Sequence, residues 1–268
     1  MRIKVAYLFA VAMSLGVPQV ASAADLPVKA PSMLAPAPIY NWTGFYVGGN
    51  IGYGWGNGDT SFTPLPSAAA FINLTPMTLS PNPKGVLGGL QLGYNWQAGT
   101  WLLGAEADIQ ASGVKGDAMV APIPNFAPAG STFAGSAATA SENIKWFGTL
   151  RARAGILVNP MLLAYATGGL AYGNVAYAAN TNYISGLCPG CVQYPTSFSK
   201  TKAGWTVGAG LEWAFMPNWT AKFEYLYIDL GSESATVNPV PANPPFQVAY
   251  NWKTTENIVR VGLNWKFP

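Results

Sequence analysis

The sequence has no histidine, two cysteines among 268 residues, and charged residues at only 9% of the chain. Without histidine, Ser-His-Asp and Cys-His nucleophilic sites are excluded, as are the usual imidazole ligands of metals and haem. We therefore expect no cofactor, and an enzyme is disfavoured because the commonest general base is missing. Soluble domains carry about 25% charged residues, so this chain is not expected to have an ordinary aqueous surface. The net charge of +3 is too small to indicate a nucleic-acid partner.

Long hydrophobic runs are scarce, and the only prominent one lies at the N-terminus. It follows the basic residues Arg2 and Lys4, covers about 13 residues and leads to the small-residue site at Ala23. This layout predicts a cleaved secretory signal peptide over residues 1–23. An uncleaved membrane anchor is the alternative, but a spanning helix needs about 20 apolar residues.

Residues 24–41 are predicted to form a mobile linker. Four prolines fall in this stretch, at positions 27, 31, 36 and 38. A segment this rich in proline cannot form a regular helix or sheet. The folded domain is therefore expected to cover residues 42–268.

The rest of the chain is rich in aromatic residues and glycine, and its apolar side chains alternate with polar or small ones. It contains 10 Trp, 13 Tyr, 12 Phe and 30 Gly. Eight segments of about ten residues alternate apolar with polar or small side chains, which is the signature of a membrane β-barrel. They are Phe45–Tyr53, Val86–Trp96, Trp101–Gln110, Trp146–Ile156, Leu162–Gly173, Trp205–Trp213, Thr220–Asp229 and Val259–Phe267. In the fifth segment both faces are mostly apolar, so alternation does not decide which of them points inward.

The connections between these segments alternate in length. Short ones, such as Gln97–Thr100, follow the second, fourth and sixth segments, whereas the others are polar or proline-rich and about 25 to 30 residues long. Tryptophans gather at the short-turn ends, where an interfacial girdle belongs. The pattern predicts an all-β protein, an eight-stranded antiparallel up-and-down transmembrane β-barrel with short periplasmic turns and long external loops. A soluble eight-stranded barrel is the disfavoured alternative, because it would not place tryptophans at its strand ends.

Several stretches resemble the outer-membrane immunogenic protein family, which comprises porin-like β-barrels of Gram-negative bacteria. They are Ala24–Leu26, Asn41–Gly54, Tyr165–Gly173, Glu224–Tyr227 and Val261–Phe267. The resemblance implies an eight-stranded outer-membrane barrel, surface exposure, a structural or host-contact role and no catalytic residues. Members usually end on the aromatic residue that the assembly machinery reads. This chain departs from the pattern, because Pro268 follows Phe267, the expected assembly signal.

The inward faces of the predicted strands carry charges of both signs. They are Glu106, Asp108, Glu212 and Glu224 against Arg151, Arg153, Lys222, Arg260 and Lys266. One interpretation is an ion pathway. The favoured one is a neutralised network that plugs the barrel, because eight strands enclose a space just wide enough for side chains. Distances counted from the short turns predict that Glu106 pairs with Arg153, and Asp108 with Arg151.

The two cysteines, Cys188 and Cys191, flank a Pro-Gly turn in the third long connection. A redox-active thiol pair is conceivable, but no strand–helix context of the thioredoxin type surrounds it. We predict a structural disulfide instead, since the compartment is oxidising.

Together these features predict a non-enzymatic outer-membrane barrel that contributes to envelope structure and presents loops outside the cell. A small-solute porin is the first alternative, and a surface receptor or adhesin acting through the external loops is the second. The expected partners are outer-membrane lipids, including lipopolysaccharide, the barrel assembly machinery, and host or surface ligands of the loops.

Overall fold

The computed structural model describes residues 40–66, 76–121, 136–185, 188–240 and 246–268. The predicted signal peptide and residues 24–39 of the predicted linker lie outside this part of the chain. In the described part, no helix is long and apolar enough to cross a membrane.

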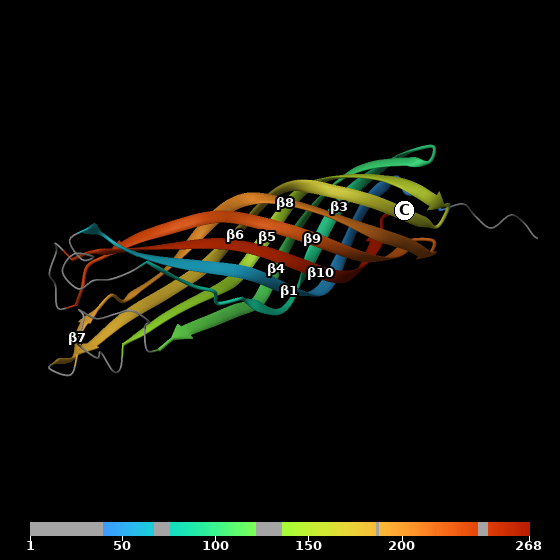
Figure 1. The fold of residues 1–268 in the computed structure, drawn as a ribbon. Coiled ribbons are helices and arrows are strands. Elements are labelled where there is room, and N and C mark those ends of the chain that lie inside the picture. Colours follow the sequence, from blue (N-terminus) through green and yellow to red (C-terminus); the bar gives the residue numbers. More distant parts are fainter. Residues whose placement is uncertain (1–39, 67–75, 122–135, 186–187, 241–245) are drawn as a thin grey trace, which may run out of the picture. The chain divides into compact units, whose positions relative to one another are not determined.

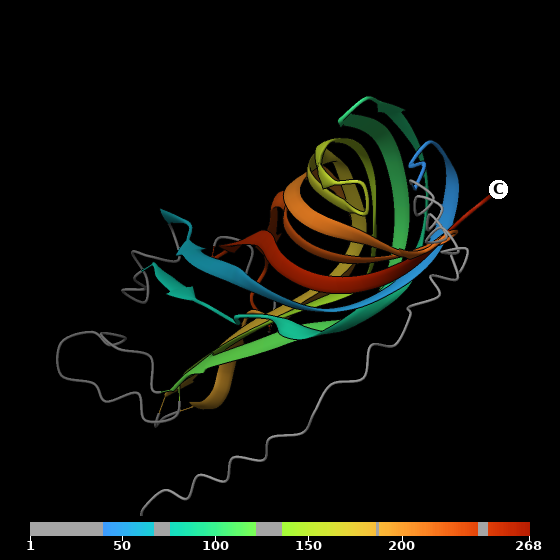
Figure 2. The same ribbon diagram turned by 90° about the vertical axis from the view of Figure 1, so that its right-hand side faces the viewer.

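Eight long antiparallel strands close into a ring (Figures 1 and 2). They are β1 Gly44–Pro64, β3 Lys84–Ala98, β4 Trp101–Val120, β5 Ala137–Asn159, β6 Leu162–Ser185, β8 Thr196–Met216, β9 Trp219–Val237 and β10 Val248–Lys266. Two short strands, β2 Met77–Leu79 and β7 Cys188–Gln193, pair with β1 and β6 respectively. The ring closes where β1 pairs with β10, from Tyr46 opposite Lys266 to Pro64 opposite Val248. The predicted eight-stranded up-and-down barrel is confirmed.

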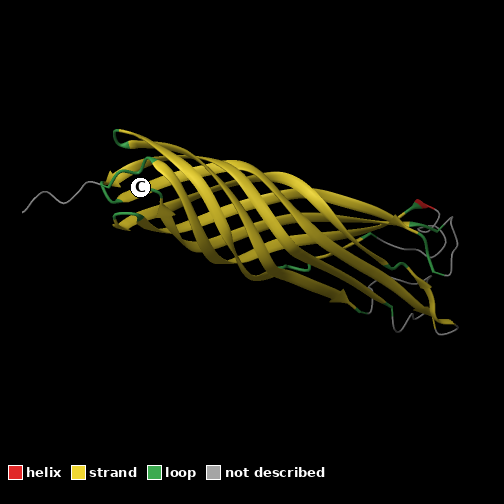
Figure 3. Cartoon of the chain, turned by 180° about the vertical axis from the view of Figure 1, so that it is seen from behind, coloured by secondary structure: helices red, strands yellow, loops and turns green. Residues whose placement is uncertain are grey.

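The strands are longer than the predicted ten-residue segments, because ring strands run for 15 to 24 residues (Figure 3). Seven of the eight predicted segments form only the part of their strand near the short turns, whereas Val86–Trp96 covers nearly all of β3. In those seven strands the ladder of backbone hydrogen bonds continues well beyond the segment, into stretches predicted to be loop. Between the third and fourth segments, for example, β4 reaches Val120 and β5 begins at Ala137. The expected loop lengths were therefore wrong at both ends of that connection.

The strand faces exchange character halfway along the barrel. Near the short turns, apolar side chains point outward, with Leu90 69% exposed, and polar ones point inward. Further along the same strands, apolar side chains such as Trp252 and Phe62 are fully buried inside. Their neighbours Asn251 and Lys253 point outward. The barrel is therefore built for lipid in its first half and for water in its second half.

Two sets of exposed aromatic residues mark the limits of the outward apolar belt. One set lies at the short turns and includes Trp96, Trp101, Trp213 and Trp219, and the other includes Trp55, Trp146 and Trp205. Along β1 the belt runs from Phe45 to Trp55, which is about the length that a tilted strand needs to cross a bilayer. We call the second set the outer girdle.

The structure decides the inward face of the fifth predicted segment, which lies in β6. Leu163, Tyr165 and Thr167 point inward, whereas Leu170 and Tyr172 point outward and are 62% and 40% exposed. Alternation alone could not make this choice, because both faces of the segment carry apolar or aromatic side chains.

Candidate functional site

A cluster of eight charged side chains fills the barrel at the level of the apolar belt. Its members are Glu106 and Asp108 from β4, Arg151 and Arg153 from β5, Glu212 from β8, Lys222 and Glu224 from β9, and Arg260 from β10. We call them the charge cluster. Their side chains are 0% exposed, apart from 2% for Glu212. They reach this position because each occupies an inward position of a strand with a period of two residues.

Arg151 joins three carboxylates of the charge cluster. Its Nη2 atom contacts Glu106 and lies 3.1 Å from Asp108 Oδ2, while Nη1 lies 3.0 Å from Glu224 Oε1. Its Nε atom donates to Thr149, whose hydroxyl donates to Asp108 Oδ2 at 2.9 Å. A planar guanidinium can make several such bonds at once, which an ammonium group on a flexible stem cannot do as specifically.

Arg260 and Lys222 approach the same carboxylates from the other side of the barrel. Arg260 Nη2 lies 2.9 Å from Asp108 Oδ2 and 2.6 Å from Glu224 Oε2. Lys222 Nζ lies 2.8 and 2.9 Å from the two carboxylate oxygens of Glu106. Glu106 is therefore shared by cations from β5 and β9, so the cluster ties opposite walls of the barrel together.

Arg153 connects the cluster to Glu212 and to two tyrosines. Its Nη2 atom lies 2.6 Å from Glu212 Oε2, and its guanidinium carbon lies 4.0 Å from the centre of the Tyr165 ring. Its Nη1 atom donates to the Tyr46 hydroxyl at 2.6 Å, and that hydroxyl donates to Glu106 Oε2 at 2.7 Å. Tyr165 donates to Glu224 Oε1 at 2.9 Å.

The charge cluster is electrically balanced, with four carboxylates against four cationic side chains. Burying a charge without a partner is very costly, but pairing and hydrogen bonding offset most of that cost. With the tyrosines and with Gln91 on β3, every one of the eight ring strands contributes a side chain to this layer. Such an arrangement can hold the wall together and occupy the lumen.

Both ion pairs predicted from the sequence are present, but each is a diagonal contact within a larger network. Asp108 lies 3.1 Å from Arg151, and Glu106 lies 3.5 Å from Arg153. In the register, however, Glu106 is directly opposite Arg151, and Arg153 is opposite Gly104. The stagger between β4 and β5 shifts the partners by two residues, and this stagger follows from the strand tilt that closes a barrel.

Lys266 was predicted to belong to the network, and the structure contradicts this. Its Nζ atom lies 3.5 Å from the Thr43 carbonyl oxygen and 5.9 Å from the centre of the Tyr40 ring. No ion pair joins it to a carboxylate in the part of the chain that the structure describes. Lys266 is the last residue of β10, and its ammonium group lies near the Tyr40 ring rather than among the cluster carboxylates.

The neutral members of the layer were not among the predicted site residues. Tyr46 could have been included, because it alternates with Gly48 and Asn50 on the inward face of its strand. Tyr165 could not have been included, because alternation did not decide which face of its segment, Leu162–Gly173, points inward. The amide chain from Asn50 through Gln91 to Asn264, which ends on Glu212 Oε1, also depends on register between distant strands.

An apolar floor closes the barrel at the short-turn end. Tyr40 and Trp42 are 8% and 1% exposed and pack with Leu102 and Leu163. Trp42 Nε1 donates to the Pro160 carbonyl at 3.2 Å. Tyr40 falls within the stretch predicted to be a mobile linker. Its ring contacts that of Trp42, and the two fill the space beneath the charge cluster.

A second apolar core fills the barrel beyond the outer girdle. It includes Phe62, Tyr177, Tyr250 and Trp252, all at most 1% exposed, with ring centres of Tyr177 and Trp252 5.5 Å apart. The sequence held a signal for it, because alternation continues along β10 from Val248 to Trp252 with the apolar face now inward.

Two buried acids, Glu142 and Glu256, lie between the outer girdle and the second apolar core. Glu256 is opposite Gly56, one residue beyond Trp55. Thr254 donates to Glu142 Oε1 at 2.6 Å, whereas both carboxylate oxygens of Glu256 are buried without a hydrogen-bond partner among the residues that the structure describes. Burial raises the pKa of Glu142 to about 7. Burial and the neighbouring charge of Glu142 raise the pKa of Glu256 to about 9.

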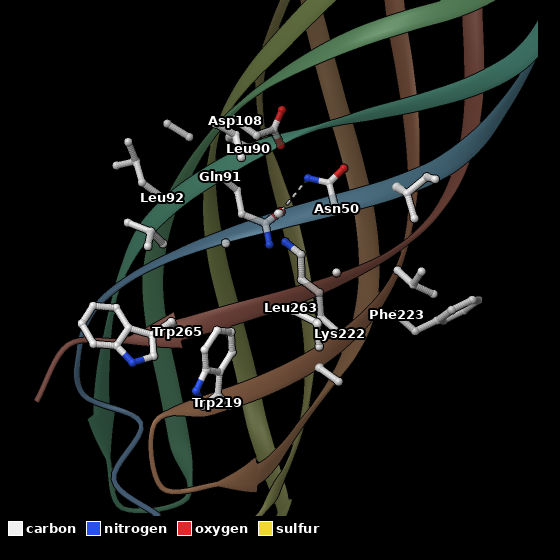
Figure 4. A pocket seen from close by; sticks show the side chains of 18 of the residues that line it. Asn50, Leu90, Gln91, Leu92, Asp108, Trp219, Lys222, Phe223, Leu263 and Trp265 are labelled. Carbon is white, nitrogen blue, oxygen red and sulfur yellow. Dashed lines mark hydrogen bonds between the residues drawn. The ribbon is translucent and has the colours of Figure 1, made fainter.

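The outer wall carries a hollow within the apolar belt (Figure 4). Its outward lining includes Leu92, Phe223 and Leu263, while Asn50 and Gln91, joined by a 2.9 Å hydrogen bond, lie on the inner side of the same wall. The hollow extends across the membrane-facing surface rather than along the lumen, so we assign it to lipid contact.

The remaining sequence-predicted residues lie at the two ends of the barrel. Cys188 and Cys191 belong to β7, at the end opposite the C-terminus in Figure 1. Their side chains lie outside the described residues, so the disulfide stays a prediction. Phe267 is 43% exposed, and its ring lies 4.6 Å from that of Trp265. Its backbone N–H donates to the Phe45 carbonyl at 2.9 Å, which places the predicted assembly signal at the ring closure.

Comparison with known proteins assigns the family. Residues 8–267 match the outer membrane protein beta-barrel domain family. The chain belongs to this family. It is 40% identical to the 31 kDa outer-membrane immunogenic protein of Brucella melitensis over 250 residues, covering 92% of this chain and 93% of that protein. It is 29% identical to the 22 kDa outer membrane protein of Rhizobium leguminosarum, covering 86% and 80% of the two chains.

A solved structure supports the fold. The outer membrane protein OprG from Pseudomonas aeruginosa aligns with a TM-score of 0.50 and 12% identity, over 85% of this chain and 98% of that one. The chain is thus an outer-membrane β-barrel protein, and the predicted outer-membrane location is confirmed. In this chain, the outward apolar belt and its two sets of exposed aromatic residues fit this location.

Proposed function

We propose that this family member is a closed, non-enzymatic outer-membrane barrel that anchors a rigid extension on the cell surface. The observation that carries the proposal is the electrically balanced charge cluster, which lies in a layer of hydrogen-bonded side chains from all eight ring strands. Each charged side chain of the cluster is paired with at least one of opposite charge, and the lumen of an eight-stranded barrel has little room beyond its side chains.

The lumen is filled at three levels, each with different chemistry. The floor around Trp42 is apolar, the charge cluster is ionic, and the core around Trp252 is apolar again. A small-solute porin would need a wetted path through all three levels. The charge cluster has no net charge and lies between two apolar layers. Because each apolar layer excludes water, this arrangement weighs against a small-solute porin.

The half of the barrel beyond the outer girdle supports the surface role. Its core is apolar and its outer face carries residues such as Asn251 and Lys253, so it resembles a small soluble barrel mounted on a membrane anchor. Strands that continue this far beyond the belt carry the connecting segments away from the lipid surface. Presentation of those segments at the cell surface is the function that this geometry serves best.

Planar-bilayer recordings test the closed barrel. The folded full-length chain, checked by its faster migration on an unheated gel, is expected to give no steady conductance steps. The variant Arg153→Ala with Glu212→Ala removes a matched pair of charges and is also expected to stay silent, because the two apolar layers remain. Large, stable steps from the unaltered protein would contradict the proposal. Steps from the variant alone would identify the charge cluster as the main barrier.

Surface presentation has a separate test. An epitope inserted within residues 122–135 should bind antibody on intact cells, and the same epitope placed in the turn at Gly99 should bind only after the outer membrane is opened. Labelling of both sites on intact cells, or of neither, would contradict the proposed orientation.

A further inference from the structure

A row of outward-facing residues crosses the barrel wall and meets the outer edge of the apolar belt at Trp55. The register places Lys84 on β3 beside Trp55 on β1, and Lys115 on β4 directly opposite Lys84. All three side chains are exposed. The row continues along the register through Asn143, Ala176 and Ser199 and contains no acidic residue.

Two ammonium groups at directly opposite positions of neighbouring strands repel each other. The nearest acid in the register is Asp117, two residues beyond Lys115 on the same face. No ion pair joins Lys84 or Lys115 to a carboxylate within the described ranges of the chain. A third ammonium group reaches the row, because Lys145 Nζ donates to Ser199 Oγ at 3.0 Å.

Two other outward lysines have acidic neighbours. Lys253 on β10 is directly opposite Asp59 on β1. Lys200 forms an ion pair with Glu233 at 2.7 Å. The charge at Lys84 and Lys115 is therefore not a general property of this surface, and it has the sign that would attract an anion.

The position of the pair indicates which anion would meet it. Val86, two residues from Lys84 toward the short turns, is 65% exposed and belongs to the apolar belt. Trp55, at 41% exposed, belongs to the outer girdle. Lysine stems can lie along apolar surface while the ammonium group stays at the level of lipid headgroups. The two ammonium groups thus face the headgroup layer of the outer leaflet, where the anions are lipid phosphates.

We propose that Lys84 and Lys115, flanked by Trp55, form a binding site for the phosphate group of a phosphorylated lipid of the outer leaflet. The phosphate would lie between the two ammonium groups and relieve their repulsion. The indole ring of Trp55 would pack beside the headgroup, as aromatic residues do at membrane interfaces. This site is independent of whether the barrel is closed.

The test measures lipid binding to the folded full-length protein in neutral detergent micelles. Bisphosphorylated lipid A is titrated, and bound lipid is counted by native mass spectrometry. The variant Lys84→Gln with Lys115→Gln should bind about 30-fold more weakly, because each surface cation contributes about fivefold to binding of an anionic lipid. Lys84→Arg with Lys115→Arg should retain binding. All the variants change exposed side chains, and an unheated gel confirms that each is folded.

Three control arms decide the outcome. Lys253→Gln removes one exposed lysine that already faces an acid and should leave the affinity unchanged within about twofold. The affinity of dephosphorylated lipid A for the unaltered protein should be as low as that of bisphosphorylated lipid A for the variant Lys84→Gln with Lys115→Gln. Inorganic phosphate at millimolar concentration should not displace the lipid. Equal binding of dephosphorylated lipid, an equal loss in Lys253→Gln, or full displacement by inorganic phosphate would each overturn the proposal. Conductance recordings test the closed barrel separately, so the two proposals can fail independently.

Discussion

Arg151 on β5 lies directly opposite Glu106 on β4, and the two side chains form an ion pair that is fully buried inside the barrel. Each of them also contacts further members of the charge cluster, so removing either leaves several buried charges with too few partners. This relationship makes the pair the most sensitive point of the lumen.

We expect Arg151→Ala to lower the free energy of unfolding by about 3–5 kcal/mol, because it leaves the four buried carboxylates of the cluster with only three cations. The matched control is Lys253→Ala, an exposed cation on β10, which should change it by less than about 0.5 kcal/mol. Urea unfolding in lipid vesicles, followed by mobility on unheated gels, measures both.

The double variant Glu106→Ala with Arg151→Ala should cost clearly less than the sum of the two single changes, since neither partner is then left alone. Strict additivity would reject this pairing and leave the barrel fold unaffected.

A second prediction concerns pH and Glu256. Its pKa is raised from 4.5 to about 9 in the folded protein by burial and by the neighbouring Glu142. A raised folded pKa means that the stabilisation is complete below about pH 4.5 and is lost as the pH rises toward 9. The free energy of unfolding should therefore fall with rising pH by up to about 1.4 kcal/mol per unit while this group titrates.

Glu256→Gln should remove most of that dependence, because the amide has nearly the same shape and does not ionise. Urea unfolding from pH 5 to pH 10 compares the two proteins. Parallel curves for the variant and the unaltered protein would show that Glu256 is not the titrating group.

A third prediction concerns Gly231, which ends the pairing of β9 with β8. Its φ is +73°, its N–H donates to Asp229 Oδ1 at 2.7 Å, and the β8–β9 register stops at Trp205 opposite Asp229. Gly231→Ala should cost about 1–2 kcal/mol, because a side chain disfavours this left-handed conformation. The control Gly168→Ala, also on a ring strand, has ordinary φ and its added Cβ would meet its nearest neighbour at 3.5 Å. A loss as large in Gly168→Ala would argue against a backbone cause.

The fourth prediction is the disulfide between Cys188 and Cys191. Protein taken from the envelope without reductant should show no thiol that reacts with an alkylating reagent, and two after reduction. Replacement of both by Ser should barely change the unfolding midpoint, because a bridge between residues so close in sequence constrains the unfolded chain little. Two reactive thiols in the unreduced protein would refute the bridge.

The fifth prediction concerns assembly. Phe267→Ala should reduce the amount of barrel inserted in the outer membrane several-fold, with little effect on the unfolding midpoint of the fraction that does insert. Deletion of Pro268 should not reduce insertion, because the aromatic residue is then terminal. Normal insertion of Phe267→Ala would show that this residue is not the signal.

The number of strands and most of their faces could be predicted from the sequence. Alternation is a local property with a period of two, so Leu90 and Leu92 had to share one face and Gln91 the other. For the same reason, the cluster carboxylates and cations on β4 and β5 were assigned to the interior correctly.

The partners within the charge cluster could not be predicted in the same way. A charge on β4 can meet a charge on β5 only at a height set by the stagger of the strands, and this stagger belongs to the closed ring as a whole. Counting from the turns therefore found Asp108 and Arg151 but missed that Arg151 stands directly opposite Glu106. Lys266 was misplaced because its inward position says nothing about its height relative to the cluster.

The sequence by itself determined an eight-stranded outer-membrane barrel, because a charge-poor, alternating chain with tryptophans at its short turns has few other ways to bury its polar face. Only the tertiary structure decided that Tyr40 and Trp42 close the floor, and that the strands continue into a second half with Trp252 and Phe62 inside. The physical reason is that alternation assigns side chains to two faces of a strand but does not determine whether each face contacts lipid, water or the barrel interior. Closure of the ring and the height of each residue along it decide which faces meet lipid, water or one another.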